Sequence, residues 1–195
     1  MKNDYRLFET AKEKFRECSV GPIYDKVVLS DGNKDNPIVM VCGEAPGKDE
    51  VAEGFPFVGR AGQLLRSSVN KYGFRRKNTL ITNIIPCRPE NNKFPSDMSL
   101  VKSCMARWLL NEIDIIKPKY MLLVGAKPLY FLLGMTGITN LRGEWYTLPD
   151  HNVECLPTFH SSYVLRKQYT KEGDQIKKHF LSDIRKVALR AELIK

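Results

Sequence analysis

The stretch from Pro37 to Tyr72 constrains the fold more than any other, because it predicts a strand, a loop and a helix in direct succession. An apolar run, Pro37–Cys42, is typical of a buried strand. A loop rich in glycine and acidic residues follows, and Gly59–Tyr72 then has the pattern of a helix. Each loop residue alone would fit an ordinary solvated connection. The whole string favours a ligand site, because open α/β sheets bind ligands at the carboxyl ends of their strands.

The rest of the chain continues this alternation of strands and helices. Three further strands are predicted at Thr79–Ile85, Tyr120–Val124 and Val153–Phe159. The other helical patterns are Asp97–Ile116, with Ser96 or Asp97 as its N-cap, Lys127–Leu133 and Asp174–Ile194. Such alternation predicts a three-layer α/β/α sandwich around a central, mostly parallel sheet. Since no repeat or linker interrupts the chain, we expect residues 1–195 to form a single domain.

Charge and cysteine content narrow the function classes. The chain carries 31 basic against 22 acidic residues, a formal net charge of +9, which favours a polyanion such as nucleic acid as partner. Many soluble proteins are basic, so charge alone does not decide this. The charged segment Met1–Glu17 lacks the apolar core of a signal peptide, and no apolar run reaches the length of a membrane span. We therefore expect a cytoplasmic protein without membrane contact, whose five cysteines are thiols or metal ligands rather than disulfides.

Polar residues follow each predicted core strand at the point where it ends. Glu44 follows the first strand, Asn83 lies near the end of the second, Gly125–Lys127 follows the third and His160–Ser162 follows the fourth. The carboxyl ends of parallel strands gather at one edge of a sheet. The sequence therefore predicts that these segments form a single site.

The side chains in these segments suit chemistry on a nucleobase. Carboxylates such as Glu44 and Glu50 can orient water or stabilise a cationic transition state. The amide of Asn83 can both donate and accept along a base edge, and Phe57 can stack on a base. His160 can donate a hydrogen bond to a developing anion. Each also has a common structural alternative, such as a core phenylalanine or a satisfied turn asparagine.

Four motifs carry a resemblance to a known family, and they are Gly43–Leu65, Asn83–Pro95, Leu141–Tyr146 and Pro157–Arg166. The chain resembles the uracil-DNA glycosylase superfamily, in particular its family 4, the iron–sulfur glycosylases, which includes versions encoded by bacteriophages. The resemblance extends from about Cys18 to the C-terminus. It implies an enzyme of base excision repair that hydrolyses the N-glycosidic bond of uracil in DNA and leaves an abasic site. We expect uracil-containing DNA as the partner and a monomeric protein.

The resemblance also implies roles for individual residues. Glu44 matches the acidic residue of the water-activating motif, and Glu50 matches a second acid in the same loop. Phe57 matches the residue that stacks on the flipped uracil, and Asn83 the one that hydrogen-bonds its edge. His160 matches the histidine that bonds the uracil carbonyl as negative charge builds on the leaving base. Further residues expected to contact the substrate are Gly43, Ala45, Pro46, Gly47 and Ser162.

The segment after His160 departs from the family pattern. The family usually has His-Pro-Ser where this chain has His160–Ser162, so the rigid φ of a proline is lost. Tyr163–Arg166 would follow as a loop that enters the minor groove. Val164 or Leu165 would be the wedge that fills the gap left by the base, and Arg166 would contact the DNA backbone.

The cysteines are the second departure. The resemblance implies a 4Fe–4S cluster with four cysteine ligands. The cysteines that match are Cys18, Cys87 and Cys104. Gly21 occupies the fourth position and offers no thiolate. Three interpretations stay open: a cluster with a non-cysteine or exogenous ligand, a three-iron cluster, or no cluster, and excision itself needs none. Cys42 and Cys155 lie in predicted strands and are expected to be buried small hydrophobes.

Two alternative functions compete with uracil excision. One is a glycosylase-like module that binds DNA or a replication protein with little or no catalysis, and the other is a glycosylase with a different base preference. The substitutions at Ser161 and Gly21 favour the binding module. The presence of Glu44, Asn83 and His160 argues against it.

Overall fold

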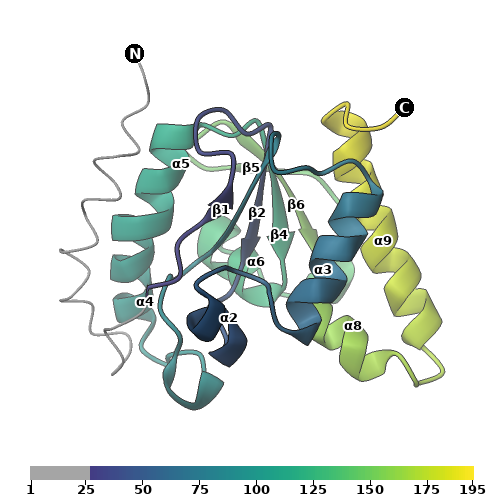
Figure 1. The fold of residues 1–195 in the computed structure, drawn as a ribbon, viewed down its shortest axis with the longest axis horizontal. Coiled ribbons are helices and arrows are strands. Elements are labelled where there is room, and N and C mark those ends of the chain that lie inside the picture. The colour runs from purple at the N-terminus through teal and green to yellow at the C-terminus, as the bar shows by residue number, and fades with distance from the viewer. Residues whose placement is uncertain (1–26) are drawn as a thin grey trace.

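A six-stranded mixed sheet forms the middle layer of the fold, with the strand order β1-β3-β2-β4-β6-β5 (Figure 1). The computed structural model describes residues 27–195. The four inner strands run parallel, and each edge strand is antiparallel to its neighbour. The strands are β1 (Asp31–Gly32), β2 (Val39–Gly43), β3 (Thr79–Asn83), β4 (Tyr120–Val124), β5 (Tyr146–Leu148) and β6 (Val153–Thr158).

Helices cover both faces of this sheet, which confirms the predicted sandwich with a mostly parallel sheet. In Figure 1, α3, α8 and α9 lie on one side of the strands, and α4 and α5 lie on the other. The helices are α2 (Lys48–Glu53), α3 (Arg60–Lys71), α4 (Met98–Met105), the π-helical segment η3 (Ala106–Leu110), α5 (Asn111–Ile116), α6 (Ala126–Leu133), α7 (Ile138–Leu141), α8 (Ser161–Lys167) and α9 (Gly173–Arg190). A short 3-10 turn, η2 (Glu90–Asn92), precedes α4.

Two apolar clusters, one on each face of the sheet, form the core. Met40 and Trp108 belong to the cluster beside α4, η3 and α5, whereas Val41 and Phe180 belong to the cluster beside α3 and α9. Neighbouring residues of β2 thus point to opposite faces, as strand geometry requires. All residues of β2 and β4 are buried, which explains why these strands are continuous apolar runs.

The predicted elements are largely confirmed, with differences at their ends. Asp97–Ile116 is a helical run from α4 through η3 to α5, and Asp97 caps it by accepting hydrogen bonds from the backbone N–H groups of Ser99 (2.9 Å) and Leu100 (3.2 Å). Helix α9 ends at Arg190 rather than at Ile194. Strands β1 and β5 were not predicted, because they are two and three residues long and too short for a pattern.

Two helices replace segments that we expected to be loops. Helix α2 lies inside the glycine-rich segment after β2. The loop expected at Tyr163–Arg166 is wrong, because these residues belong to α8, whose N-cap is His160. Val164 faces the core and is 2% exposed, which ties α8 to the sheet.

The inner strands end together at one edge of the sheet. In the parallel registers, Gly43 is opposite Asn83 and Val124 is opposite Thr158. The segments that leave these ends are therefore neighbours in space. Among residues 27–195, no helix combines the length and apolar character that crossing a membrane requires.

Candidate active site

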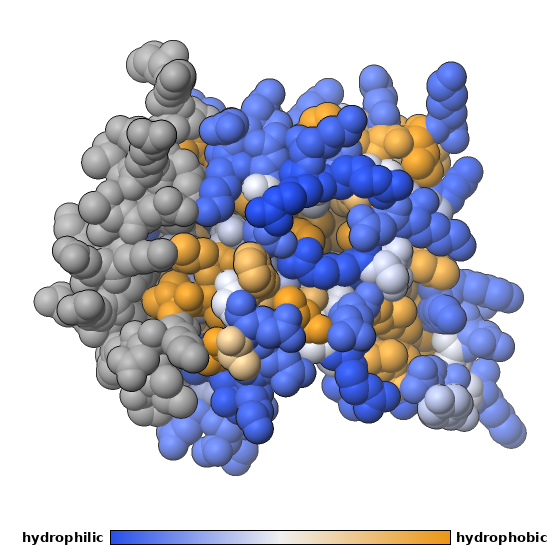
Figure 2. Space-filling model, viewed as in Figure 1, coloured by the Kyte–Doolittle hydropathy of each residue, from blue (hydrophilic) through white to orange (hydrophobic). Residues whose placement is uncertain are grey.

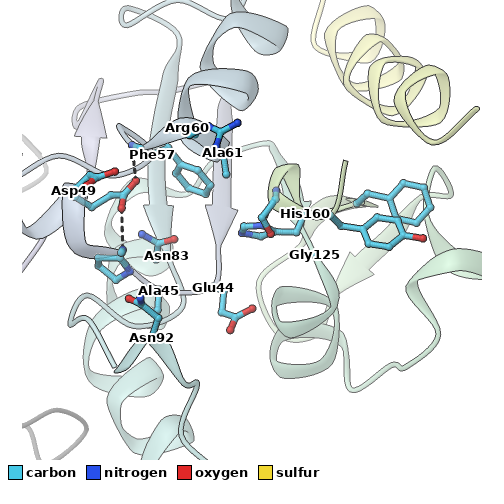
Figure 3. Close-up of a pocket in the computed structure, with 18 of the residues that line it drawn as sticks. Glu44, Ala45, Asp49, Phe57, Arg60, Ala61, Asn83, Asn92, Gly125 and His160 are labelled. Atoms are coloured by element: carbon cyan, nitrogen blue, oxygen red, sulfur yellow. Dashed lines mark hydrogen bonds between the residues drawn. The ribbon is translucent and has the colours of Figure 1, made fainter. Parts of the chain in front are cut away.

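A cavity of about 850 Å³ lies at the carboxyl edge of the parallel strands. Glu44, Asn83, Gly125 and His160 line it, so the four segments that follow the inner strands meet as predicted (Figure 3). The expected substrate-contacting residues that also line it are Ala45, Pro46, Gly47, Phe57 and Ser162. The edge of the sheet thus brings together side chains from distant parts of the chain.

Asn83 is the last residue of β3, and it presents a buried amide to this cavity. The residue is 4% exposed, and its side chain makes no hydrogen bond within residues 27–195. Buried polar groups are normally paired, so an unpaired amide that lines a cavity is suited to binding a polar ligand.

Gly43, which we expected to contact the substrate, is not among the residues that line the cavity, and it lies opposite Asn83 in the strand register. A Cβ atom at Gly43 would lie 2.2 Å from Cζ of Phe57 and 2.6 Å from Oδ1 of Asn83. The absent side chain therefore makes room for the phenylalanine ring and the amide at once.

Phe57 forms a wall of the cavity and adopts a strained backbone conformation. Its φ is +58°, in the left-handed region that costs a non-glycine residue on the order of 1 kcal/mol or more. The ring is buried, and its centroid lies 6.4 Å from that of the His160 imidazole. Helix α3 packs so close that a Cβ at Gly62 would lie 2.1 Å from the carbonyl carbon of Phe57.

Glu50 holds the loop that carries Phe57, residues 54–59, from one side. Its carboxylate accepts backbone N–H hydrogen bonds from Gly47 (2.9 Å), Val58 (3.0 Å) and Gly59 (3.0 Å). Both carboxylate oxygens are therefore engaged by the backbone. This geometry favours a positioning role for Glu50 over the catalytic role that we expected for this second acid of the loop.

Arg66 holds the same loop from the other side. Its guanidinium donates to the carbonyl oxygens of Pro56 (2.7 Å) and Phe57 (3.1 Å). It also pairs with Asp31 of β1 (2.9 Å), which is ion-paired with Arg76 as well. Sequence reasoning missed this role, because nothing in the sequence near Arg66 shows that it contacts a loop nine residues earlier or a strand 35 residues earlier.

Glu44 is a carboxylate of this cavity that makes no hydrogen bond with the described part of the protein, and unlike the exposed Asp49 it is partly buried. Burial raises the pKa of Glu44, and the nearby positive charge of Lys127 partly offsets that rise. Glu44 is thus an acidic group available to a ligand or a water molecule.

His160 faces the cavity with a fixed ring orientation (Figure 3). Its Nδ1 accepts the backbone N–H of Ser162 (3.2 Å) and lies 2.8 Å from the Ser162 hydroxyl. Burial, with a smaller effect of the Arg166 charge, lowers the pKa of His160 to about 4, although Glu50 acts in the opposite direction. The ring is therefore neutral at pH 7, and its proton is on Nε2, which is left to the cavity.

Gly125 and Arg166 support this arrangement. Gly125 has a φ of +108°, and a Cβ there would lie 3.1 Å from Cβ of His160. Arg166 donates to the Ser162 hydroxyl (3.1 Å), which in turn directs the hydroxyl proton toward Nδ1 of His160. The helix start therefore fixes the tautomer by local contacts.

The residues expected to engage DNA lie at different depths on α8. Val164 is packed in the core and is not available as a wedge while the helix is folded, which corrects that expectation. Leu165 is half-buried and does not line the cavity. Its position on α8, next to the cavity-lining Arg166, is the part of the wedge prediction that the structure retains. Arg166 is exposed and lines the cavity. Lys48 and Arg60 also line it, although the sequence patterns do not mark them as site residues.

The cysteines do not assemble a metal site in the part of the chain that is described. Cys87 and Cys104 are both buried, whereas Cys18 and Gly21 lie outside the described residues. Within residues 27–195, no three side chains of His, Cys, Asp or Glu come together to hold a metal. Cys42 and Cys155 lie in the core, as expected, and burial raises the pKa of both thiols, that of Cys155 to about 12.

Comparisons with known proteins agree on one family. The model of the uracil DNA glycosylase superfamily matches residues 29–185. A type-4 uracil-DNA glycosylase of Thermotoga maritima is 35% identical over 188 residues, which cover 92% of each chain. A type-4 uracil-DNA glycosylase of Pyrobaculum aerophilum is 39% identical over 164 residues, 80% of this chain and 83% of its own. One of Archaeoglobus fulgidus is 31% identical over 179 residues, 88% of this chain and 85% of its own.

Proposed function

Because the chain belongs to the uracil-DNA glycosylase superfamily, we propose that it hydrolyses the N-glycosidic bond of uracil in DNA and leaves an abasic site. The observation that carries the proposal is the convergence of an unpaired amide, an aromatic wall, a neutral imidazole and an unengaged carboxylate on one cavity. We propose that residues 1–195 act as one catalytic domain, as a monomer, on DNA in the cytoplasm.

Recognition starts with the base leaving the DNA stack, because a paired base is out of reach of the cavity. Phe57 stacks on the flipped uracil, and its strained backbone is fixed by Glu50 and Arg66 before the substrate arrives. The Asn83 amide pairs with the O4 and N3–H edge of uracil, which presents one acceptor and one donor. Both residues thus act on the base rather than on the sugar.

The chemical step separates charge along the breaking C1′–N1 bond. The sugar becomes oxocarbenium-like, and Glu44 stabilises it and orients the attacking water. The uracil ring becomes anionic, and Nε2–H of neutral His160 donates to its carbonyl oxygen as that charge develops. A neutral donor suits this task, because it needs no proton uptake from solvent at pH 7.

A family 4 enzyme would normally hold an iron–sulfur cluster, and the cysteines of this chain fit that cluster incompletely. Cys87 and Cys104 are buried in the fold, Cys18 supplies a third thiol in the sequence, and Gly21 stands at the fourth position. Cys42 and Cys155 are core thiols with raised pKa values, and coordination requires a thiolate. The excision step derived above uses only the side chains of the cavity.

The test is excision from a fluorescent oligonucleotide with one uracil, followed by alkali, which breaks the strand at an abasic site. The wild-type protein should produce the shortened strand from uracil DNA and not from the same sequence with thymine. Asn83→Ala should lower the single-turnover rate roughly five- to 150-fold while binding abasic DNA nearly normally, because a bidentate base contact contributes about 1–3 kcal/mol.

The matched control for Asn83→Ala is Asn111→Ala, which changes an exposed asparagine of α5. This control should excise uracil at the wild-type rate. Absence of strand breakage by the wild-type protein, on single-stranded and on duplex uracil DNA, would overturn the proposed function. An unchanged rate for Asn83→Ala would overturn only the role of that residue.

A further inference from the structure

The turn between α8 and α9, residues 168–172, carries the most exposed large hydrophobic side chain of the fold as described. Tyr169 in this turn is 93% exposed. A single exposed aromatic is common on protein surfaces and means little alone. Its setting gives it significance, since the turn is rigid, it is basic, and it follows directly on the helix that begins at the active-site histidine.

Hydrogen bonds and close packing make this turn a fixed platform. The backbone N–H and the hydroxyl of Thr170 donate to the carbonyl oxygen of Lys167, at 2.9 and 2.8 Å. The N–H of Gly173 donates to the carbonyl oxygen of Thr170 at 2.9 Å. A Cβ at Gly173 would lie 2.3 Å from the Lys167 carbonyl oxygen, so this glycine lets the start of α9 close against the end of α8.

The charges around Tyr169 favour an anionic partner. The basic residues of the turn and its flanks are Arg166, Lys167, Lys171, Lys177 and Lys178. Two acids, Glu172 and Asp174, lie among them, which leaves an excess of positive charge. None of the four lysines forms an ion pair within residues 27–195. Figure 2 shows hydrophilic side chains projecting into solvent on the side of the molecule where α9 lies. Such unpaired lysines are available to phosphates.

The length of α8 sets the distance between this platform and the active site. Figure 1 shows α8 leading away from the carboxyl edge of the sheet toward the turn. Helix α8 has seven residues, so at 1.5 Å per residue it is about 10 Å long, and this length separates His160 at its N-cap from the turn that follows its end. A strand whose uracil lies in the cavity can therefore reach the turn with nucleotides that flank the flipped base.

We propose that the α8–α9 turn is a second nucleic-acid contact, in which Tyr169 stacks on a base of single-stranded DNA that flanks the flipped uracil. The neighbouring lysines hold phosphates of the same strand. The inference rests on the proposed function, because it takes the cavity to hold uracil. Single-stranded DNA is the ligand that fits, since an exposed ring can stack on bases whose faces are open, as in other single-strand-binding surfaces.

The experiment measures excision and binding against the length of the strand that flanks the uracil. Single-stranded substrates carry two or eight nucleotides on the 5′ side, the 3′ side or both. The wild-type kcat/KM should rise about five- to tenfold when one flank, on the side that α8 faces, grows from two to eight. Tyr169→Ala should lose that gain and match the wild type on the short substrates, and Tyr169→Phe should keep the gain because it keeps the ring.

A control variant and a binding measurement separate this proposal from the proposed function. Leu189→Ala changes another exposed apolar side chain on α9 and should behave as the wild type. Fluorescence anisotropy with uracil-free single strands should show a several-fold weaker Kd for Tyr169→Ala on twelve-nucleotide strands and no difference on four-nucleotide strands. This arm requires no excision, so it tests the turn even if the wild-type protein leaves uracil in place.

Three results would overturn the proposal. The first is the same dependence on flank length in Tyr169→Ala and the wild type. The second is an equal loss on short and long substrates, which would mean that the substitution disturbs the cavity. The third is a loss that appears only with duplex flanks, which would assign the turn to double-stranded DNA.

Discussion

The two walls of the cavity hold their central side chains by different means. Phe57 lies in an irregular loop with a strained φ, and this loop is fixed on both sides, because its backbone N–H groups donate to Glu50 and its carbonyl oxygens accept from Arg66. His160 lies at the start of a helix, and its ring is held by Ser162, two residues further along. Strain on one wall is thus offset by contacts from elsewhere in the fold, whereas the other wall is positioned by its local sequence.

The largest effect should come from removing the carboxylate that holds the Phe57 loop. Glu50→Ala deletes three hydrogen bonds to a charged acceptor, each worth about 1.5–3 kcal/mol. We expect about a hundredfold or greater loss of kcat/KM together with weaker inhibition by free uracil, because Phe57 loses its place. Glu50→Gln keeps an oxygen that can accept the N–H groups of Val58 and Gly59, so it should retain part of the activity.

Excision kinetics and uracil inhibition measured side by side check this expectation. The matched control is Glu53→Ala, an exposed glutamate in the same helix. If Glu50 activated water instead, Glu50→Gln would be as inactive as Glu50→Ala, and both would bind free uracil normally. That result would show that Glu50 does not hold the Phe57 loop, so the two walls would no longer differ in how they are supported.

The next effect concerns the stability of the His160 wall against acid. The folded protein holds the His160 pKa at about 4, below the ordinary value of 6.5, so only the unfolded chain gains this proton as the pH falls between those values. The stabilisation is complete above pH 6.5 and is lost as the pH falls toward 4. The loss is about 3 kcal/mol, because each tenfold difference in proton affinity between the folded and unfolded chains corresponds to roughly 1.4 kcal/mol.

Urea unfolding from pH 7.5 to 4.5 measures this dependence. His160→Gln should lose stability less steeply than the wild type over that range. Both proteins keep Glu44, so the difference between their curves isolates the histidine. Parallel curves for His160→Gln and the wild type would show that His160 is not kept neutral by the fold.

A smaller effect is expected when one of the two contacts on the imidazole is removed. Ser162→Ala deletes the hydroxyl 2.8 Å from Nδ1 and keeps the backbone N–H at 3.2 Å. We expect about a five- to tenfold lower single-turnover rate, since one neutral hydrogen bond contributes about 1 kcal/mol, with little change in Tm. Ser67→Ala, on the exposed face of α3, is the matched control. A loss as large as that of Glu50→Ala would mean that both walls depend equally on side-chain support.

The smallest effect should be a gain in stability at Ser161, where the family usually has proline. The Ser161 hydroxyl is buried and has no hydrogen-bond partner in the described structure. Ser161→Ala should therefore raise the free energy of unfolding by about 0.5–1 kcal/mol and leave excision unchanged. Calorimetry on both proteins measures the change. A lower Tm in the variant would indicate that the hydroxyl has a partner in solution.

The sequence predicted the parts of the molecule that depend on local patterns. The inner strands are apolar runs, and Glu44, Asn83 and His160 could be assigned to one edge because parallel strands end together. The roles of Glu50 and Arg66 could not be predicted, since they depend on contacts that only the folded loop creates. Helix α8 was missed because the short polar segment at its start resembles a loop.

The pairing of Gly43 with Asn83 determines how destabilising the sheet would affect the activity of the protein. The two residues lie on strands separated by a long crossover, and their contact exists only when β2 and β3 are in register. A chain with an incomplete central sheet therefore lacks the proposed uracil-binding edge altogether, rather than having a weakened form of it. Changes that destabilise the sheet should lower the number of competent molecules in a cell and leave the turnover of each intact molecule as it was.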